Sequence, residues 1–192
     1  MEGEQKRKKA EYRSSLRSKA LIRNALVSLL QEKPFEKITI TDIVRKADIN
    51  RGTFYAHYRD TTEVLEKIRK DVISDISDIF SVMSADMIIN NPRQFFTLIS
   101  DWLMENEDYY KKLLSISGAY DLIAEVKHSA VDYLLTAERM KRNLNRNYAV
   151  SILDFIVSAS CNLYLDILTS RIPLTLSDAP DFLSGIITKL KT

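Results

Sequence analysis

Apolar residues recur at helical spacing along almost the whole chain, and this periodicity constrains the fold most strongly. After Ser15, which can cap a helix, one apolar face is formed by Leu16, Ala20, Ile22, Leu26, Leu29 and Leu30. Similar faces follow within 64–80, 92–103, 122–138, 148–170 and 179–190. Only four glycines and four prolines interrupt 192 residues, which favours long helices joined by short links. The sequence therefore predicts an all-α fold.

Basic residues concentrate at the N-terminal end. Residues 1–60 carry 14 lysines and arginines against 8 acidic residues, whereas residues 61–192 carry 14 against 18. This asymmetry indicates that one end of the protein meets a polyanion such as nucleic acid. The segment KRKK at 6–9 belongs to a charged stretch without periodicity, so we expect residues 1–14 to be a flexible basic arm. The arm either follows DNA phosphates or is simply solvated.

Cysteine usage and the polar N-terminus indicate a cytoplasmic protein. Cys161 is the single cysteine, so neither an intrachain disulfide nor a thiolate metal cluster can form, and we expect an inert packed thiol. The first residues lack the apolar core of a signal peptide, and no uninterrupted apolar run reaches the length of about 18 residues that suggests a membrane span. We expect no cofactor and no metal.

Two short helices and a turn are predicted between residues 39 and 58. The segment TITD (39–42) resembles a capping box, with Thr39 as the N-cap and Asp42 three residues later. A turn at DIN (48–50) follows, in which Asp48 and Asn50 tolerate left-handed or capping geometry. Asn50 or Arg51 then opens a third helix over RGTFYAHY (51–58). This order is the helix-turn-helix arrangement.

The third helix has the composition of a DNA-reading helix. Phe54 is the expected inward anchor, with Tyr58 one turn later. The outer side then carries small and polar side chains, which is what contact with base edges requires. These outer residues are Arg51, Gly52, Thr53, Tyr55 and His57.

The segment ITITDIVRKADINRGTFYAHYRDTTEVL (38–65) resembles the TetR/AcrR family of bacterial transcriptional regulators. The resemblance implies an N-terminal three-helix DNA-binding domain (15–60) and a larger C-terminal helical domain (61–192) for dimerisation and ligand sensing. It implies a homodimeric repressor that binds a palindromic operator on double-stranded DNA and is released by a small-molecule or protein effector. Base readout is then expected near Arg51, Gly52, Thr53 and Tyr55. Phosphate contacts are expected from His57 and from Thr39 or Thr41, at the start of the second helix.

Two positions depart from the family pattern. Asp48 stands where a glycine is common in the turn, and aspartate can adopt the same backbone conformation. Thr61 stands where the family tends to place a phosphate-binding lysine, and it cannot supply that charge. Arg59 is the nearest basic residue that can replace it.

The C-terminal domain carries candidate dimer and ligand surfaces. A helix that is apolar on most of its circumference is buried on more than one side, so the last two long helices suit a dimer interface. The expected interface residues are Ile152, Phe155, Ile156, Ala159, Leu163, Phe182 and Ile186. Aromatic residues with polar tips can line a pocket or simply fill the core; the pocket candidates are Phe96, Trp102, Tyr110 and Tyr133.

Catalytic motifs are missing from the sequence, so we do not expect an enzyme. There is no Gly-rich phosphate loop, GxSxG elbow or HExxH motif, and His128 has no metal partner at a suitable spacing. Two alternatives to a regulator remain open. One is a DNA-binding nucleoid or division factor, which would use the same helix-turn-helix. The other is a helical protein-interaction module that has lost DNA binding, which Thr61 would fit.

Overall fold

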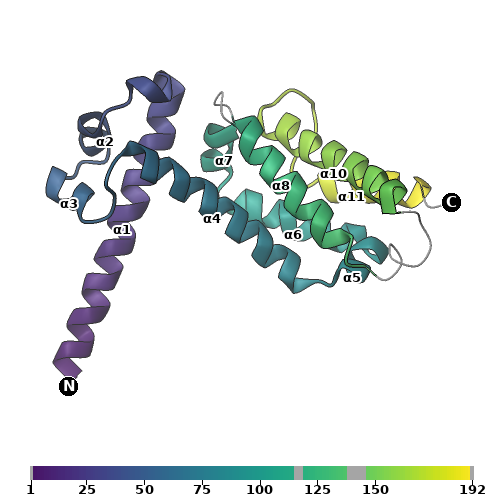
Figure 1. Ribbon diagram of the computed structural model, residues 1–192, viewed down its shortest axis with the longest axis horizontal. Coiled ribbons are helices and arrows are strands. Elements are labelled where there is room, and N and C mark those ends of the chain that lie inside the picture. The colour runs from purple at the N-terminus through teal and green to yellow at the C-terminus, as the bar shows by residue number, and fades with distance from the viewer. Residues whose placement is uncertain (1, 115–118, 138–145, 191–192) are drawn as a thin grey trace. The chain divides into compact units, whose positions relative to one another are not determined.

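The computed structural model describes residues 2–114, 119–137 and 146–190, and its regular secondary structure in those ranges is entirely helical (Figure 1). This confirms the predicted all-α class. The chain divides into two compact units, Met1–Asp71 and Val72–Thr192. The division lies later than the boundary expected at residues 60 and 61, because the apolar face of one helix continues from the first unit into the second.

The first unit has a small core around the Phe54 ring, which is fully buried. Ile22 and Leu26 from the first helix and Ile43 from the second are fully buried as well. Leu16, the first residue of the predicted apolar face, is 48% exposed because the packed part of the helix begins further along the chain. The unit consists of α1 (Glu2–Glu32), η1 (Phe35–Lys37), α2 (Ile40–Lys46), α3 (Arg51–Tyr55) and the first part of α4 (Thr61–Val82).

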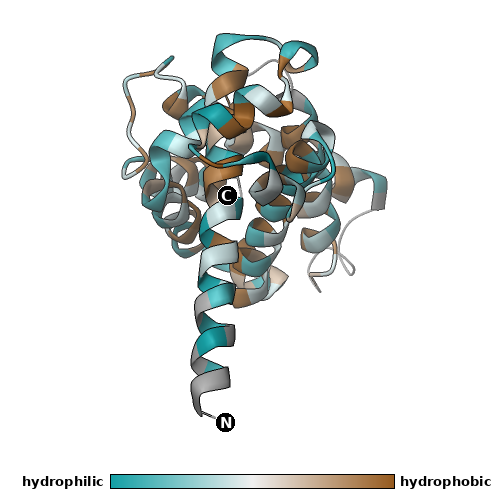
Figure 2. Ribbon diagram, turned by 90° about the vertical axis from the view of Figure 1, so that its left-hand side faces the viewer, coloured by the Kyte–Doolittle hydropathy of each residue, from teal (hydrophilic) through white to brown (hydrophobic). Residues whose placement is uncertain are grey.

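Helix α1 begins at Glu2, whereas we expected a flexible arm over residues 1–14. The segment has no apolar face, but it is rich in Glu, Gln, Lys, Arg and Ala, which all have high helix propensity. Arg7 Nε also donates to Glu11 Oε1 at 2.9 Å, an ion pair at the i,i+4 spacing that supports an exposed helix. The extension projects beyond α2 and α3 (Figure 1), and its described residues are mainly hydrophilic (Figure 2).

The second unit is a helical bundle with an aromatic and aliphatic core. Helix α6 packs on α11, and α8 packs on α10. Pro92 occupies the first turn of α6, as predicted. The buried Tyr164 hydroxyl donates to the Phe96 carbonyl at 3.0 Å and pairs with Ser100 Oγ at 3.0 Å. The remaining helices are α5 (Ala85–Asn90), α6 (Pro92–Glu105), α7 (Glu107–Leu114), α8 (Ala119–Leu134), α10 (Arg146–Leu168) and α11 (Ala179–Leu190).

Helix α10 contains Asn147–Leu168, a stretch that is long and apolar enough to cross a membrane. It is the one such stretch in the part of the chain that the structure describes. We had expected none, because polar residues interrupt the apolar run. The core helix of a helical bundle has the same composition, and α10 here contacts α7, α8 and α11.

Candidate DNA-binding surface

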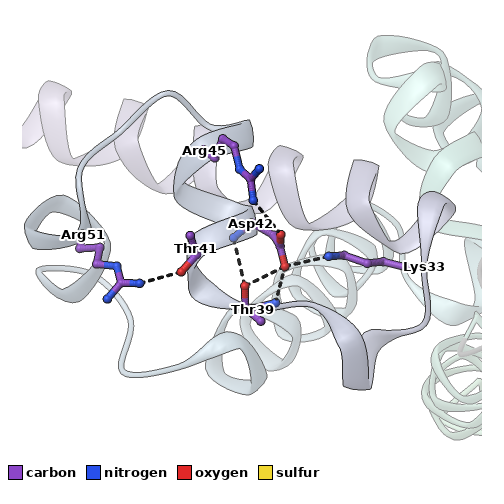
Figure 3. Close-up of polar contacts among 6 residues, drawn as sticks. All are labelled: Lys33, Thr39, Thr41, Asp42, Arg45 and Arg51. Atoms are coloured by element: carbon purple, nitrogen blue, oxygen red, sulfur yellow. Dashed lines mark hydrogen bonds and ion pairs between the residues drawn. The ribbon is translucent and has the colours of Figure 1, made fainter.

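The start of α2 is fixed by a capping box between Thr39 and Asp42, as predicted (Figure 3). Thr39 Oγ1 accepts from the Asp42 amide at 3.2 Å, and Asp42 Oδ2 accepts from the Thr39 amide at 2.9 Å. The Lys33 ammonium lies 2.7 Å from the same carboxylate, and with the Thr39 donors it holds the pKa of Asp42 well below its ordinary value. Thr39 and Thr41 remain exposed on the first turn of α2. The contact of Lys33 with Asp42 was not predicted, because no spacing rule links Lys33 to the capping box.

The turn after α2 places Asp48 in the left-handed region, with φ 53°. The Ile49 amide donates to the Val44 carbonyl at 3.0 Å, and the Asp48 amide donates to the Arg45 carbonyl at 3.3 Å. These two bonds form a Schellman motif, in which the left-handed position usually belongs to glycine. The prediction that Asp48 adopts the backbone of the glycine seen in the family is therefore confirmed.

Helix α3 is capped by Asn50 and is shorter than expected. Asn50 Oδ1 accepts from the Thr53 amide at 2.7 Å and from Thr53 Oγ1 at 3.1 Å. The helix covers Arg51–Tyr55 rather than 51–58, because the chain turns after Tyr55. The amides of His57 and Tyr58 both donate to the Phe54 carbonyl there. A Cβ at Gly52 would lie 3.2 Å from Asn50 Oδ1, so the missing side chain keeps the cap uncrowded.

The side chains of the α3 segment divide between the core and the surface, as the periodicity predicted. Phe54 and Tyr58 are buried, with ring centroids 6.1 Å apart. Arg51 and Gly52 are exposed, and the Tyr55 side chain is 56% exposed. The other two predicted contact residues on this segment, Thr53 and His57, are half-buried.

Helices α2 and α3 bring predicted contact residues together on one surface. Arg51 Nη2 donates to Thr41 Oγ1 at 2.7 Å, so the guanidinium lies beside the first turn of α2 (Figure 3). A guanidinium has five N–H donors, so most of the donors of Arg51 stay available for another acceptor. The surface therefore presents the positively charged guanidinium of Arg51 next to the exposed threonines Thr39 and Thr41.

Arg59 is exposed but paired within its own segment. Its amide donates to Glu63 Oε2 at 2.6 Å, and its Nε lies 3.3 Å from the same oxygen. These contacts lower the pKa of Glu63, and the amide bond contributes most. Asp60 Oδ1 accepts from the Glu63 amide at 2.8 Å and so caps α4. Arg59 lies near the start of α4, as required of a substitute for the lysine of the family.

The residues expected at a dimer interface lie on α10 and α11, and all of them except Ile152 border an apolar groove. Phe155 is 66% exposed, which is unusual for a phenylalanine side chain, and Phe182 and Ile186 are also exposed. The helix α10 residue Ala159 is exposed as well. The half-buried members of the set are Ile152, Ile156 and Leu163.

Three of the four expected pocket residues line a real cavity in the second unit. Phe96, Trp102 and Tyr110 border a cavity of about 720 Å³. Tyr133 is not among the lining residues, because its hydroxyl donates to the Met83 carbonyl at 2.7 Å and its ring packs on Phe80. Across the described ranges, no three His, Cys, Asp or Glu side chains gather as metal ligands would.

Sequence comparisons find a family likeness over the helix-turn-helix. Residues 22–68 match the family described as bacterial regulatory proteins, tetR family. An uncharacterized HTH-type transcriptional regulator of Bacillus subtilis, YxbF, is 33% identical over 84 residues, which are 43% of this chain and 22% of that protein. The transcriptional activator DhaS of the Lactococcus lactis dhaKLM operon is 25% identical over 113 residues, which are 57% of this chain and 55% of that protein. The matches thus span only part of either relative.

Structural comparisons extend the likeness over most of the chain. The structure of the dihydroxyacetone kinase operon activator DhaS has a TM-score of 0.62 at 18% identity, covering 90% of this chain and 95% of that one. A TetR transcriptional regulator from Streptococcus agalactiae has a TM-score of 0.60 at 21% identity, covering 93% and 97%. At these identities the likeness shows a shared fold.

Proposed function

We propose that the chain is a sequence-specific transcriptional regulator of the TetR family that binds DNA as a homodimer, and the family match over residues 22–68 supports this. One observation carries the proposal: the capped starts of α2 and α3 hold the exposed residues Arg51 and Thr41 together on one polar surface. A helix-turn-helix inserts such a surface into the major groove. Double-stranded DNA is the partner that this surface fits.

The contacts divide by chemistry into base readout and phosphate binding. Arg51 is assigned to a guanine edge, which accepts two hydrogen bonds from a guanidinium. Gly52, Thr53 and Tyr55 lie beside it and contact neighbouring bases. The phosphate contacts are assigned to Thr39, Thr41, His57 and Arg59, because helix starts and flexible basic side chains suit a backbone anion.

The extended start of α1 is proposed to follow DNA phosphates next to this surface. The described Arg7 and Lys9 side chains are exposed, whereas the side chains of Lys6 and Lys8 lie outside the described residues. Arg13 and Arg17 are exposed further along the same helix. A helix that carries these cations adds sequence-independent affinity that falls as salt rises.

Dimerisation is proposed through the apolar groove of α10 and α11. A twofold dimer supplies two DNA-binding units, and the proposal requires them to reach successive major grooves, which lie about 34–36 Å apart. The operator then has to be a palindrome. Phe155 is the main support for this interface, because burying its exposed ring against a second chain would lower the free energy.

Repression by promoter occlusion in the cytoplasm is the proposed mode of action. An effector bound to the second unit would favour a conformation in which the two helix-turn-helix units of the dimer no longer match the spacing of the operator half-sites. The relative DhaS is named an activator, so the sign of regulation needs its own measurement. In a reporter strain, repression predicts higher expression from the target promoter when the gene is deleted, and activation predicts lower expression.

Mapping the occupancy of the chain across the genome that encodes it tests the function. The proposal predicts a few strong sites near promoters, which an Arg51→Ala variant loses. Many weak, scattered sites would instead point to a nucleoid or division role. No sites with folded protein would overturn the proposal and favour a helical protein-interaction module.

A further inference from the structure

The cavity of the second unit is large enough to hold a small molecule. Its volume of about 720 Å³ lies within the range of about 300–1,000 Å³ that is typical of ligand sites. Its walls come from helices α4, α5, α6, α7, α8, α10 and α11, and most are aliphatic or aromatic. An apolar surface of this extent is unfavourable when it faces water, so a ligand that covers it gains affinity from burial.

Every described residue that lines the cavity is uncharged. The polar groups of the walls are serine and tyrosine hydroxyls, the Trp102 indole and the Cys161 thiol. Burial raises the pKa of Cys161 to about 11 and that of Tyr164 to about 12, so both groups are neutral at physiological pH. Lys127 acts on the Cys161 thiol but is not one of the lining residues. A charged ligand group would therefore lose its hydration without gaining an ionic partner among the described wall residues.

Two neighbouring residues of the cavity wall, Trp102 and Tyr110, carry hydrogen-bond donors. The Trp102 and Tyr110 rings lie with their centroids 4.5 Å apart. Within the described residues, neither the Trp102 indole N–H nor the Tyr110 hydroxyl has a hydrogen-bond partner, whereas the Tyr164 hydroxyl is paired with Ser100 and the Phe96 carbonyl. These two donors suit an acceptor oxygen on the ligand.

The charges that act on the Tyr110 hydroxyl are negative. Burial raises the pKa of the Tyr110 hydroxyl, and the carboxylates of Asp75 and Glu105 raise it further. The same carboxylates would repel a ligand carboxylate or phosphate placed against Trp102. The two hydrogen-bond donors and the negative charge of the nearby carboxylates together favour a neutral acceptor, such as the oxygen of an alcohol or an ester.

We infer that the cavity binds an uncharged, mainly apolar molecule that places one hydrogen-bond-accepting oxygen against Trp102 and Tyr110. The inference deepens the proposed function, since it rests on the proposal that the second unit senses a small molecule. It predicts that free fatty acids and phosphorylated metabolites bind this cavity more weakly than uncharged analogues.

Displacement of a fluorescent dye from the purified full chain tests the inference. N-phenyl-1-naphthylamine is apolar, uncharged and free of oxygen, and it is competed with 1-dodecanol, methyl dodecanoate or dodecanoate at pH 8. The alcohol and the ester are expected to bind at least about tenfold more tightly than the carboxylate. Dodecanoate binding as tightly as the ester, or no binding of any probe to a chain whose circular dichroism shows a folded protein, would overturn the inference.

Two variants locate the site. Trp102→Phe keeps an aromatic ring and removes the N–H donor. It is expected to lower the affinity for the ester and the alcohol by about two- to tenfold and to leave the affinity for the dye unchanged. Val126→Phe adds bulk to the wall and is expected to weaken all three ligands and the dye. Unchanged binding in both folded variants would show that the ligands bind elsewhere and would refute the assignment.

The assay separates the inference from the proposed function, because it contains no DNA. DNA affinity is measured in parallel with and without methyl dodecanoate. If the ester binds but does not change DNA affinity, the cavity assignment stands and effector control fails. If DNA binding is sequence-specific but no probe binds, the regulator stands and the cavity assignment fails.

Discussion

Replacing Arg51 with alanine removes the centre of the proposed reading surface with little effect on folding. The side chain is exposed, and its hydrogen bond to Thr41 lies on the surface, so the free energy of unfolding should change by at most about 0.5 kcal/mol. A bidentate contact with a base contributes about 1–3 kcal/mol. A dimer loses the contact in both half-sites, so the variant should lose about 2–6 kcal/mol of binding free energy, which raises Kd by at least about 30-fold.

Fluorescence anisotropy with the selected operator measures this loss. Operators with single base changes are titrated alongside, because a lost base contact also relaxes the preference at one position of each half-site. Arg51→Lys is the matched control: it keeps the charge but not the planar fork, so it should bind better than the alanine variant while showing the same relaxed preference. Urea unfolding of each variant checks that the fold is intact.

A Kd within threefold of wild type, with an unchanged base preference, would refute the role of Arg51 in reading. A large loss of affinity with unchanged preference would assign Arg51 to a phosphate instead. In that case the salt dependence should fall by about one unit of slope for each lost contact.

Four further variants test other parts of the account. Thr39→Ala removes the N-cap of α2 and should lower the free energy of unfolding by about 1 kcal/mol in urea titrations, whereas Thr39→Ser should stay close to wild type; equal losses would contradict the cap. The pKa of Asp42 is lowered in the fold, so the stability it contributes is present above its ordinary value of 3.8 and is lost as pH falls below it. Acid titrations should therefore show a shallower loss of stability below about pH 4 for Asp42→Asn than for wild type, and identical profiles would exclude this contribution. Deleting residues 2–9 should weaken DNA binding and reduce its salt slope, and an unchanged slope would mean that the extension makes no phosphate contact. Phe155→Asp should yield a monomer in sedimentation, and a mass that stays dimeric would place the interface elsewhere.

The local signals in the sequence predicted the helix-turn-helix well. The capping box at Thr39 and Asp42, the left-handed Asp48 and the buried Phe54 are each decided by a few neighbouring residues. Such features depend on short-range chemistry, which a sequence displays directly. The family resemblance pointed to the same segment.

Features that depend on weak or distant interactions were not predictable. The start of α1 at Glu2 follows from helix propensity and the Arg7–Glu11 ion pair, and a periodicity argument ignores a segment without an apolar face. The Lys33–Asp42 contact and the bond from Tyr133 to Met83 join residues that no spacing rule connects. Helical periodicity identifies a buried face, but not whether that face borders a cavity or a neighbouring helix, which is why Tyr133 was misassigned.

Selection of bound sequences from random double-stranded DNA by the purified chain, at moderate salt, tests the central claim most directly. The account predicts enrichment of a palindrome whose half-sites are separated by about one helical turn, and loss of that enrichment in the Arg51→Ala variant. Enrichment of a single unpaired half-site would contradict the dimeric mode of reading. No enrichment by the folded protein would contradict sequence-specific regulation altogether.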